Sequence, residues 1–455
     1  MIKQISKIFI LSILILSFYS CEVVYQAPDL TGKKFALKVD IKDAPQSSDT
    51  NRLTIPYTEE DVKITLEISL VDYFGTVLKQ PLNRVAIIPE NGKAVPKYID
   101  PSVFVDGKAV IEVSLVNTYG SINIVAEEDE GIVGVSDKQI HFKPLSILNI
   151  QKPANETDPS SSSPFYYNFV KVDETANQNL MVLHASGSGM YIIDLDRMTD
   201  TDNSGACMIK QNGKWIKNPA FVTGNGGYNT VYIYSRNAPV NYDDESSETG
   251  LFDFLKAGHK LEWFAGNLVE FPPSFTNGMT ELSFPIWSIK KSEFLLTDDQ
   301  IKTRLAQVPI CDLEPSDYPI GNDQIKILER YESNLVRVKN VKIGAFDADN
   351  RDYKRYHQWQ IVPEGGAGKM SVASIESAAE FDEQYLKGNP TGKDLLSITG
   401  IMHQVYGDIW IIYVRNKCDI KVKDAPNWNT WLDEANGKKC PEVCGDNWND
   451  EVDCN

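Results

Sequence analysis

Apolar and polar residues alternate over long stretches of this chain, and glycine interrupts the alternation about every ten residues. The segment "VKITLEISLVDYFG" (62–75) places an apolar side chain at every second position and then reaches Gly75. The segment "KAVIEVSLVNTYGSINIVAE" (108–127) repeats the arrangement. Because successive side chains of a strand point to opposite faces, a period of two predicts half-buried strands, and the glycines predict turns. We expect an antiparallel β-sandwich here.

This first part resembles the immunoglobulin-like (Ig-like) modules of bacterial surface proteins, most clearly in "DGKAVIEVSL" and "YGSINIVAEEDEG". The resemblance covers about a quarter of the chain and implies an Ig-like β-sandwich over residues 35–150. Residues 151–164 contain "KPANETDPSSSSP", which is rich in proline, serine and acidic residues and lacks the apolar side chains that a core needs. They are predicted to form a linker.

Strand-like segments continue after the linker in two similar blocks. The first holds "GMYIIDLD" (189–196), "YNTVYIYS" (228–235) and "HKLEWFAGNLVEF" (259–271). The second holds "ESNLVRVKNVKIGAFD" (332–347), "RYHQWQIVP" (355–363) and a strand pair over 394–420. The length of 455 residues predicts two to four domains, and 20 tyrosines fit strand-rich ones.

Both blocks resemble the OB-like modules that accompany the catalytic domains of secreted bacterial nucleases. The residues that match the family pattern are Gly258, Gly266, Glu270, Thr280, Glu281 and Leu282 in the first block, and Gly400, Gly407, Trp410, Arg415, Asp419 and Ile420 in the second. The resemblance implies two five-stranded barrels, over residues 165–290 and 326–421, joined by a helical connector over 291–325. The predicted fold class is therefore mostly β, an Ig-like β-sandwich followed by two OB-like β-barrel domains.

The connector contains the clearest short helix signal, "TDDQIKTRLA" (297–306). Thr297 is a good N-cap residue, two acidic residues follow it, and Ile301 and Leu305 are spaced by one helical turn.

The N-terminus carries Lys3 and Lys7, then an aliphatic run, and then Cys21 within "LSFYSCEVV" (16–24). This order is typical of a secretory signal, and the serine before Cys21 resembles the lipobox of bacterial lipoproteins. The resemblance implies a signal peptide over residues 1–20, a lipid on Cys21 and a tether over 21–34. It places the protein on the outer membrane or cell surface, with the membrane as a partner through the lipid. An ordinary secretory signal with an incidental cysteine is the alternative.

The net charge opposes nucleic acid as a partner. The chain has 45 basic and 63 acidic residues, a formal charge of −18, which becomes −20 when residues 1–20 and their two lysines are removed. Such a charge repels phosphate backbones and anionic lipid at long range.

Six cysteines remain after Cys21, an even number that in an exported chain predicts three disulfides without fixing their connectivity. They are Cys207, Cys311, Cys418, Cys440, Cys444 and Cys454, of which the last three lie in a Cys/Asp-rich tail over residues 422–455. Cys440 and Cys444 also have a metal-like spacing, but no histidine follows them, so disulfides are favoured over zinc.

Catalytic motifs are not evident. "HASGSG" (184–189) lacks the G-x-S-x-G elbow of serine hydrolases, and "GGAGKM" (365–370) lacks the spacing of a phosphate-binding loop. Calcium is a candidate cofactor, because Asp200, Asp202 and Ser204 occupy the first, third and fifth positions of an EF-hand-like loop. Because Gln211 replaces the bidentate glutamate at position twelve, a solvated turn is the preferred interpretation, and no cofactor is predicted.

Candidate ligand-binding residues lie in "RDYKRYHQWQ" (351–360), where basic and aromatic side chains alternate as they do on nucleic-acid-binding strands. They are Arg351, Tyr353, Lys354, Arg355, Tyr356 and Trp359. The alternative is a strand with Trp359 in the core and the charges in solvent, which the acidic net charge favours.

The sequence thus predicts a non-catalytic, membrane-anchored exported lipoprotein that binds an extracellular protein or glycan. The first alternative is an extracellular nucleic-acid-binding OB-fold protein. The second is a carbohydrate-active enzyme, whose paired carboxylates no motif singles out among 63 acidic residues.

Overall fold

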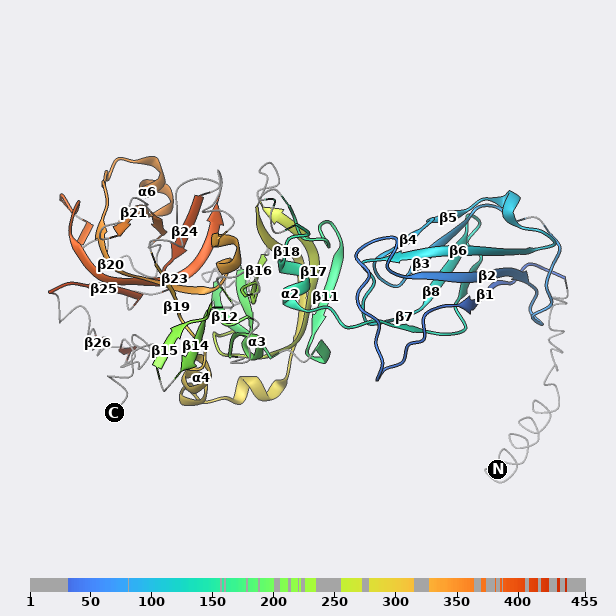
Figure 1. The fold of residues 1–455 in the computed structure, drawn as a ribbon, viewed down its shortest axis with the longest axis horizontal. Helices are drawn as coiled ribbons and strands as arrows, with labels where there is room; N and C mark the ends of the chain where they lie inside the picture. Colours follow the sequence, from blue (N-terminus) through green and yellow to red (C-terminus); the bar gives the residue numbers. More distant parts are fainter. Residues whose placement is uncertain are drawn as a thin grey trace, which may run out of the picture.

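The computed structural model places three β-rich parts in a row (Figure 1). It describes residues 32–80, 82–155, 158, 161–176, 179–186, 189–199, 205–211, 214–219, 221, 226–234, 255–271, 278–314, 327–363, 370–373, 381, 385–386, 388–405, 409–415, 419–424, 432–433 and 438–439. The prediction of a mostly β fold is confirmed.

The first part, which we call the sandwich, consists of two four-stranded antiparallel sheets that share one apolar core. One sheet has the order β1 (Ala36–Asp43), β2 (Lys63–Val71), β6 (Lys108–Val116), β4 (Lys93–Val95); the other has the order β5 (Tyr98–Ile99), β3 (Val85–Pro89), β8 (Ile124–Glu128), β9 (Val133–Val135). A short pair, β7 (Ser121–Ile122) and β10 (Ile140–His141), completes it. The predicted alternation is present in β2, whose Ile64, Leu66 and Ile68 are at most 1% exposed.

The second part, the first unit, is a six-stranded sheet. Its order is β11 (Phe169–Asp173), β17 (Leu261–Phe271), β18 (Met279–Ile289), β16 (Thr230–Tyr234), β13 (Gly189–Asp194), β12 (Leu180–Ser186). β16 and β18 are parallel and the other neighbours are antiparallel. A bridge between Met181 and Lys260 brings β12 next to the start of β17. The hairpin β14 (Met208–Gln211) and β15 (Lys214–Lys217) is inserted between β13 and β16.

The third part, the second unit, is a seven-stranded sheet. Its order is β19 (Cys311–Leu313), β20 (Leu335–Ile343), β21 (Gln358–Pro363), β22 (Met370–Ala373), β24 (Ile409–Tyr413), β23 (Asp394–Val405), β25 (Ile420–Val422), and β20 pairs with β23 as well. β22 and β24 are parallel, as are β19 and β20. A two-stranded pair, β26 (Leu432–Asp433) and β27 (Lys438–Lys439), follows.

The two units repeat one pairing pattern. The pattern involves five strands, which in chain order are β12, β13, β16, β17 and β18 in the first unit and β20, β21, β22, β23 and β24 in the second. In each unit the first strand pairs with the second, the second with the third, the third with the fifth and the fifth with the fourth. The fourth strand also lies beside the first. In both units the third and fifth strands form the parallel pair. One glycine of each fourth strand lies against the fifth: a Cβ on Gly266 would lie 2.9 Å from the Ser283 oxygen, and one on Gly400 2.5 Å from the Tyr413 oxygen. Both glycines belong to the pattern matched in the sequence.

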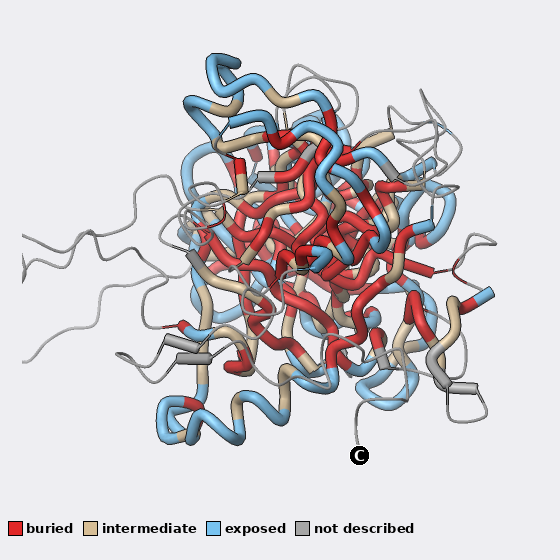
Figure 2. Tube along the Cα trace, turned by 90° about the vertical axis from the view of Figure 1, so that its left-hand side faces the viewer, coloured by how far each residue is buried: buried red, intermediate tan, exposed pale blue. Residues whose placement is uncertain are grey.

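The two units share a core and a covalent link. A single cluster of buried side chains runs from Met181 and Tyr191 in the first unit to Ile401 and Val414 in the second. Figure 2 looks along the row and shows buried segments at the centre of the molecule and exposed ones around them. Cys207, before β14, is bonded to Cys311 in β19 across 104 residues. One of the predicted disulfides is therefore present; Cys21, Cys418, Cys440, Cys444 and Cys454 lie outside the described residues.

Short helices join the strands: α2 (Ile147–Gln151), α3 (Leu195–Thr199), α4 (Asp298–Leu305) and α6 (Arg351–Tyr356), with 3-10 turns η1 (Pro101–Val103), η2 (Glu174–Ala176), η4 (Lys291–Leu295) and η6 (Glu329–Tyr331). The helix predicted after Thr297 is confirmed as α4, and Thr297 forms a capping box with Gln300.

The strand predicted at 355–363 begins only at Gln358, so that prediction was wrong for the residues before it. Asn350 caps α6 by accepting a hydrogen bond from the Asp352 amide, and His357 ends it with a φ of 51°. Local capping therefore overrides the strand pattern over 351–356.

The described ends of the predicted linker are packed. Gln151, the last residue of α2, is 1% exposed, and Ser163 is 5% exposed. Ile147 and Ile150 of α2 belong to the core of the first unit, which also receives Ile55 from the sandwich. These contacts attach the sandwich to the first unit.

Replacing both bonded cysteines, in a Cys207→Ser/Cys311→Ser variant, should lower the free energy of unfolding by about 2–5 kcal/mol, because the disulfide closes a loop of 104 residues. Urea unfolding followed by circular dichroism measures the loss. A double variant with an unchanged urea midpoint would contradict this role of the link.

Candidate functional site

The structure separates the candidate ligand-binding residues of the sequence. Arg351, Lys354, Arg355 and Tyr356 are exposed on α6. Lys354 forms an ion pair with Asp349 at 2.7 Å, and the Arg355 guanidinium lies 5.2 Å from the Tyr356 ring centroid. The helix thus presents its cations to solvent, one of them already paired with a carboxylate.

The aromatic members of the set point elsewhere. Tyr353 is half-buried and packs edge to face on Phe346, with ring centroids 4.8 Å apart. Trp359 is 4% exposed and stacks on Phe381 at 5.5 Å, within the shared core. Its ring offers no open face on which a base could stack.

A cavity of about 340 Å³ lies beside α6, where the loop after β20, the first residues of β21 and the first residue of β24 meet. It is lined by Ala345, Phe346, Asp347, Asn350, Asp352, Gln358, Trp359, Gln360 and Ile409. Gln358 and Gln360 alternate with Trp359 and Ile361, which are buried, so both amides stand on the outer face of the strand.

The lining of this cavity is polar and acidic. It combines two carboxylates and three side-chain amides with four apolar residues, which are Ala345, Phe346, Trp359 and Ile409. Carboxylates repel phosphate, whereas carboxylates and amides together accept and donate hydrogen bonds to hydroxyl groups. The cavity is therefore suited to an uncharged, hydroxyl-rich ligand.

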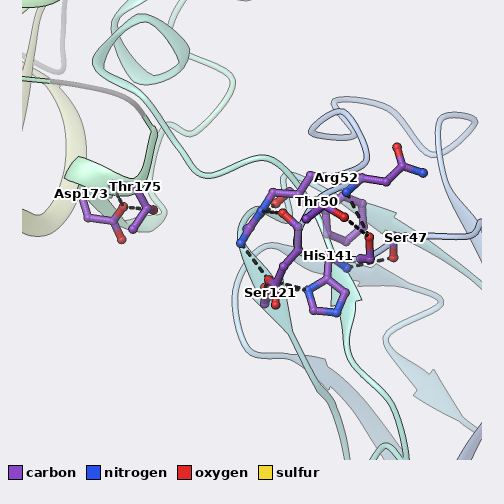
Figure 3. A network of polar contacts seen from close by, with 11 residues as sticks. Ser47, Thr50, Arg52, Ser121, His141, Asp173 and Thr175 are labelled. Atoms are coloured by element: carbon purple, nitrogen blue, oxygen red, sulfur yellow. Dashed lines mark hydrogen bonds and ion pairs between the residues drawn. The ribbon is translucent and has the colours of Figure 1, made fainter.

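A second polar cluster lies where the sandwich approaches the first unit (Figure 3). The Nδ1 atom of His141 is 2.9 Å from the Ser121 hydroxyl and 3.3 Å from the Asp49 carboxylate. A catalytic triad needs the serine and the acid on different ring nitrogens. Because both oxygens face Nδ1 here, the set is a hydrogen-bond cluster without triad geometry.

A cleft of about 790 Å³ adjoins this cluster and extends to Thr175 of the first unit. The Arg52 guanidinium on its wall donates to the Asp49 carboxylate and to the carbonyl oxygens of Asp49 and Phe142. The cleft thus lies between the sandwich and η2 of the first unit.

Buried ionisable groups gather where the segment that follows the sandwich, residues 151–164, meets the two units. Glu332 is fully buried; it accepts hydrogen bonds from the Gln151 side chain and, at 3.0 Å, from the Thr280 amide. Glu270 accepts from the Ser163 amide at 3.0 Å and from the Thr280 hydroxyl. Burial, and then the nearby Glu329, raises the pKa of Glu332 well above its ordinary value.

Burial also sets the protonation of the neighbours. It raises the pKa of Glu270 and of Glu281 to about 7, and it lowers the pKa of His403 to about 4. His403 lies 2.8 Å from the Tyr191 hydroxyl of the other unit. These groups are therefore held neutral at mildly acidic pH, which avoids the cost of buried charge.

Sequence reasoning matched Glu270 and Glu281 as pattern residues but did not identify them as titratable groups. The signal was present, since each lies in a strand-forming segment where an acid is unexpected. Arg415 and Asp419, also pattern residues, form a two-bonded pair at 2.7 and 3.0 Å. Gly407 lies outside the described residues.

Other sequence candidates are not placed. Asp200, Asp202 and Ser204 lie outside the described residues, as does Cys21. Within the described ranges, no three His, Cys, Asp or Glu side chains group closely enough to hold a metal ion. No helix of the described chain is long and apolar enough to cross a bilayer.

A scan against models of protein families finds no match for this chain, and a search of curated proteins finds none either.

The buried acids should make stability fall as pH rises. Glu270 stays protonated in the folded chain until about pH 7, whereas the unfolded chain ionises it near pH 4.5. The raised pKa of Glu270 therefore adds to the free energy of unfolding fully below pH 4.5, and this contribution is lost as pH rises through 7. Glu270→Gln should therefore reduce the loss of unfolding free energy between pH 5 and pH 8 by about 2–3 kcal/mol.

Urea unfolding at the two pH values measures this difference. Glu174→Gln, at an exposed position on η2, is the matched control and should leave the pH dependence of the parent chain unchanged. An identical pH slope for Glu270→Gln and the parent would show that folding does not raise the pKa of Glu270.

Proposed function

We propose that this chain is a non-catalytic, lipid-anchored exported protein of the bacterial outer membrane or cell surface, which binds a glycan. In this proposal the sandwich is an Ig-like stalk and the two units are OB-like modules. The signal-like residues 1–20 and Cys21 support the anchor.

The repeated strand order supports the OB-like assignment. An OB-like module pairs its five strands so that the first lies beside both the second and the fourth, and binds ligands on its second and third strands and on the loops after the first and fourth. The pairing of β20 with both β21 and β23 fits that description.

The cavity beside α6 is the observation that carries the proposed function. It lies at the loop after the first strand of the second unit, at the start of the second strand and at the first residue after the loop between the fourth and fifth. This is where OB-like modules take their ligands, and its amides and carboxylates suit sugar hydroxyls.

Nucleic acid is the weaker candidate. Arg351 and Arg355 are exposed on α6, but Asp347 and Asp352 line the adjoining cavity, and Trp359 is withdrawn into the core. A phosphate backbone would meet two carboxylates at this surface.

Glycan binding can be tested with an array of bacterial and host polysaccharides followed by calorimetry on any positive. Gln360→Ala should weaken binding about tenfold, because it removes one hydrogen-bonding amide from the cavity. Gln307→Ala, an exposed glutamine outside the cavity, should leave the affinity unchanged.

Several results would contradict the proposal. Equal affinity of the parent and Gln360→Ala for the glycan would show that the glycan binds outside this cavity. Salt-sensitive binding of single-stranded DNA, with no glycan bound, would favour the nucleic-acid alternative. Turnover of a bound glycan would favour the carbohydrate-active enzyme.

Anchoring can be tested separately by mass spectrometry of the protein from native membranes. The N-terminal peptide should begin at Cys21 and carry the mass of a diacylglycerol and its acyl chains. An unmodified cysteine, with residues 1–20 retained or cleaved elsewhere, would contradict the lipoprotein assignment.

A further inference from the structure

Three aromatic side chains project from one end of the sandwich. Phe35, Tyr73 and Phe74 are 55%, 54% and 68% exposed. They contact one another edge to face, with ring centroids 5.2 Å apart for Phe35 and Tyr73 and 5.3 Å apart for Tyr73 and Phe74. Val105, 71% exposed, lies at the same end, in the turn before β6. We call these four residues the aromatic end.

The turn that presents the rings is built by polar contacts. The Asp72 carboxylate accepts hydrogen bonds from the Phe74 and Thr76 amides, each at 2.9 Å, and Gly75 adopts a φ of 79° that favours glycine. The conformation of the turn is therefore fixed while its aromatic side chains remain in solvent. Large apolar side chains grouped in this way mark an interaction surface.

The aromatic end lies away from the rest of the protein (Figure 1). β1 starts here, with Ala36 opposite Val71. The other end of the sandwich places Tyr57 and Tyr119 against Phe165, at the first unit. No described part of the chain outside the sandwich covers the aromatic end.

The chain also enters the sandwich at this point. The Gly32 amide donates to the Asp72 carboxylate at 3.2 Å, and the Gln80 side chain donates to the Gly32 oxygen at 3.0 Å. Gly32 follows Cys21 by eleven residues, which span at most about 40 Å even when fully extended. A lipid on Cys21 would therefore keep Gly32, and the aromatic end with it, within about 40 Å of the bilayer surface.

Three ion pairs lie around the aromatic end. Lys79 lies 3.6 Å from Asp106, Arg84 lies 3.6 Å from Asp129, and Lys34 lies 3.8 Å from Glu128. Such a surface has little net attraction to anionic headgroups and little repulsion from neutral ones. It fits a zwitterionic lipid surface.

We propose that the aromatic end contacts the bilayer that holds the anchor, with Phe35, Tyr73 and Phe74 at the level of the headgroups. Aromatic rings favour this region because they combine an apolar body with a polarisable face, and tyrosine adds a hydroxyl. The contact adds to the attachment through the lipid and orients the sandwich on the membrane. This inference rests on the proposed lipid anchor.

The test uses the full, lipidated protein in vesicles of phosphatidylcholine with brominated acyl chains, which quench nearby tryptophan. The parent has eight tryptophans, so the signal of the new one is the emission of Phe74→Trp minus that of the parent. This difference should be at least twofold smaller in the brominated vesicles than in vesicles of unbrominated lipid. Leu295→Trp is the matched control: Leu295 is 82% exposed on η4 of the first unit, and its added emission should not change.

The outcomes separate the inference from the anchor. Vesicle flotation together with quenching of the Phe74→Trp emission alone supports the proposal. Flotation with no quenching overturns the membrane contact and leaves the anchor intact. Failure of the parent to float overturns both. If the Phe74→Trp emission instead changes with protein concentration in the absence of vesicles, the surface is a contact between copies of this chain, and the proposal is also overturned.

Discussion

The carboxyl group of Glu332 connects the segment that follows the sandwich with both units. Gln151, at the end of the segment that leaves the sandwich, donates to it, and so does the amide of Thr280 in the first unit, while Glu332 itself precedes the first long strand of the second unit. With the side chain fully buried, each bond replaces one to water, and loss of either partner leaves a polar group without compensation. The relative positions of the two units and the segment after the sandwich thus depend on a buried carboxyl group whose pKa burial raises.

A shared core also holds the two units together. Tyr191 of the first unit bonds His403 of the second, and the bond between Cys207 and Cys311 joins an insertion of one unit to an edge strand of the other. Independent modules on a flexible linker would bury little area between them. Here the apolar cluster is continuous across both units, so we infer that the pair moves as one body.

Sequence reasoning succeeded where the structure depends on local pattern. The alternation of apolar and polar residues correctly predicted the strands β2 and β6, and the N-cap signal at Thr297 correctly predicted the helix α4. It was wrong at 351–357, where the alternation of basic and aromatic residues indicates a strand but Asn350 caps a helix. The residues of the cavity come from separate segments, such as Phe346, Gln360 and Ile409, which only folding brings together. The pairing of Glu332 with Gln151, 181 positions apart, left no local signal either.

The two proposed contact surfaces lie at opposite ends of the row. The aromatic end is the beginning of the sandwich, and α6 with its cavity belongs to the far unit (Figure 1). A protein held at a membrane gains from such a layout, because its binding site then faces outward from the surface. That benefit requires the connections between the parts to be stiff, since a free hinge at 151–164 would let the binding unit lie back against the bilayer. Burial of Gln151 and Ser163 at the two ends of that segment opposes such a hinge. In the anchored arrangement that we propose, the buried bonds of Gln151 with Glu332 and of Ser163 with Glu270 keep the binding unit directed away from the bilayer.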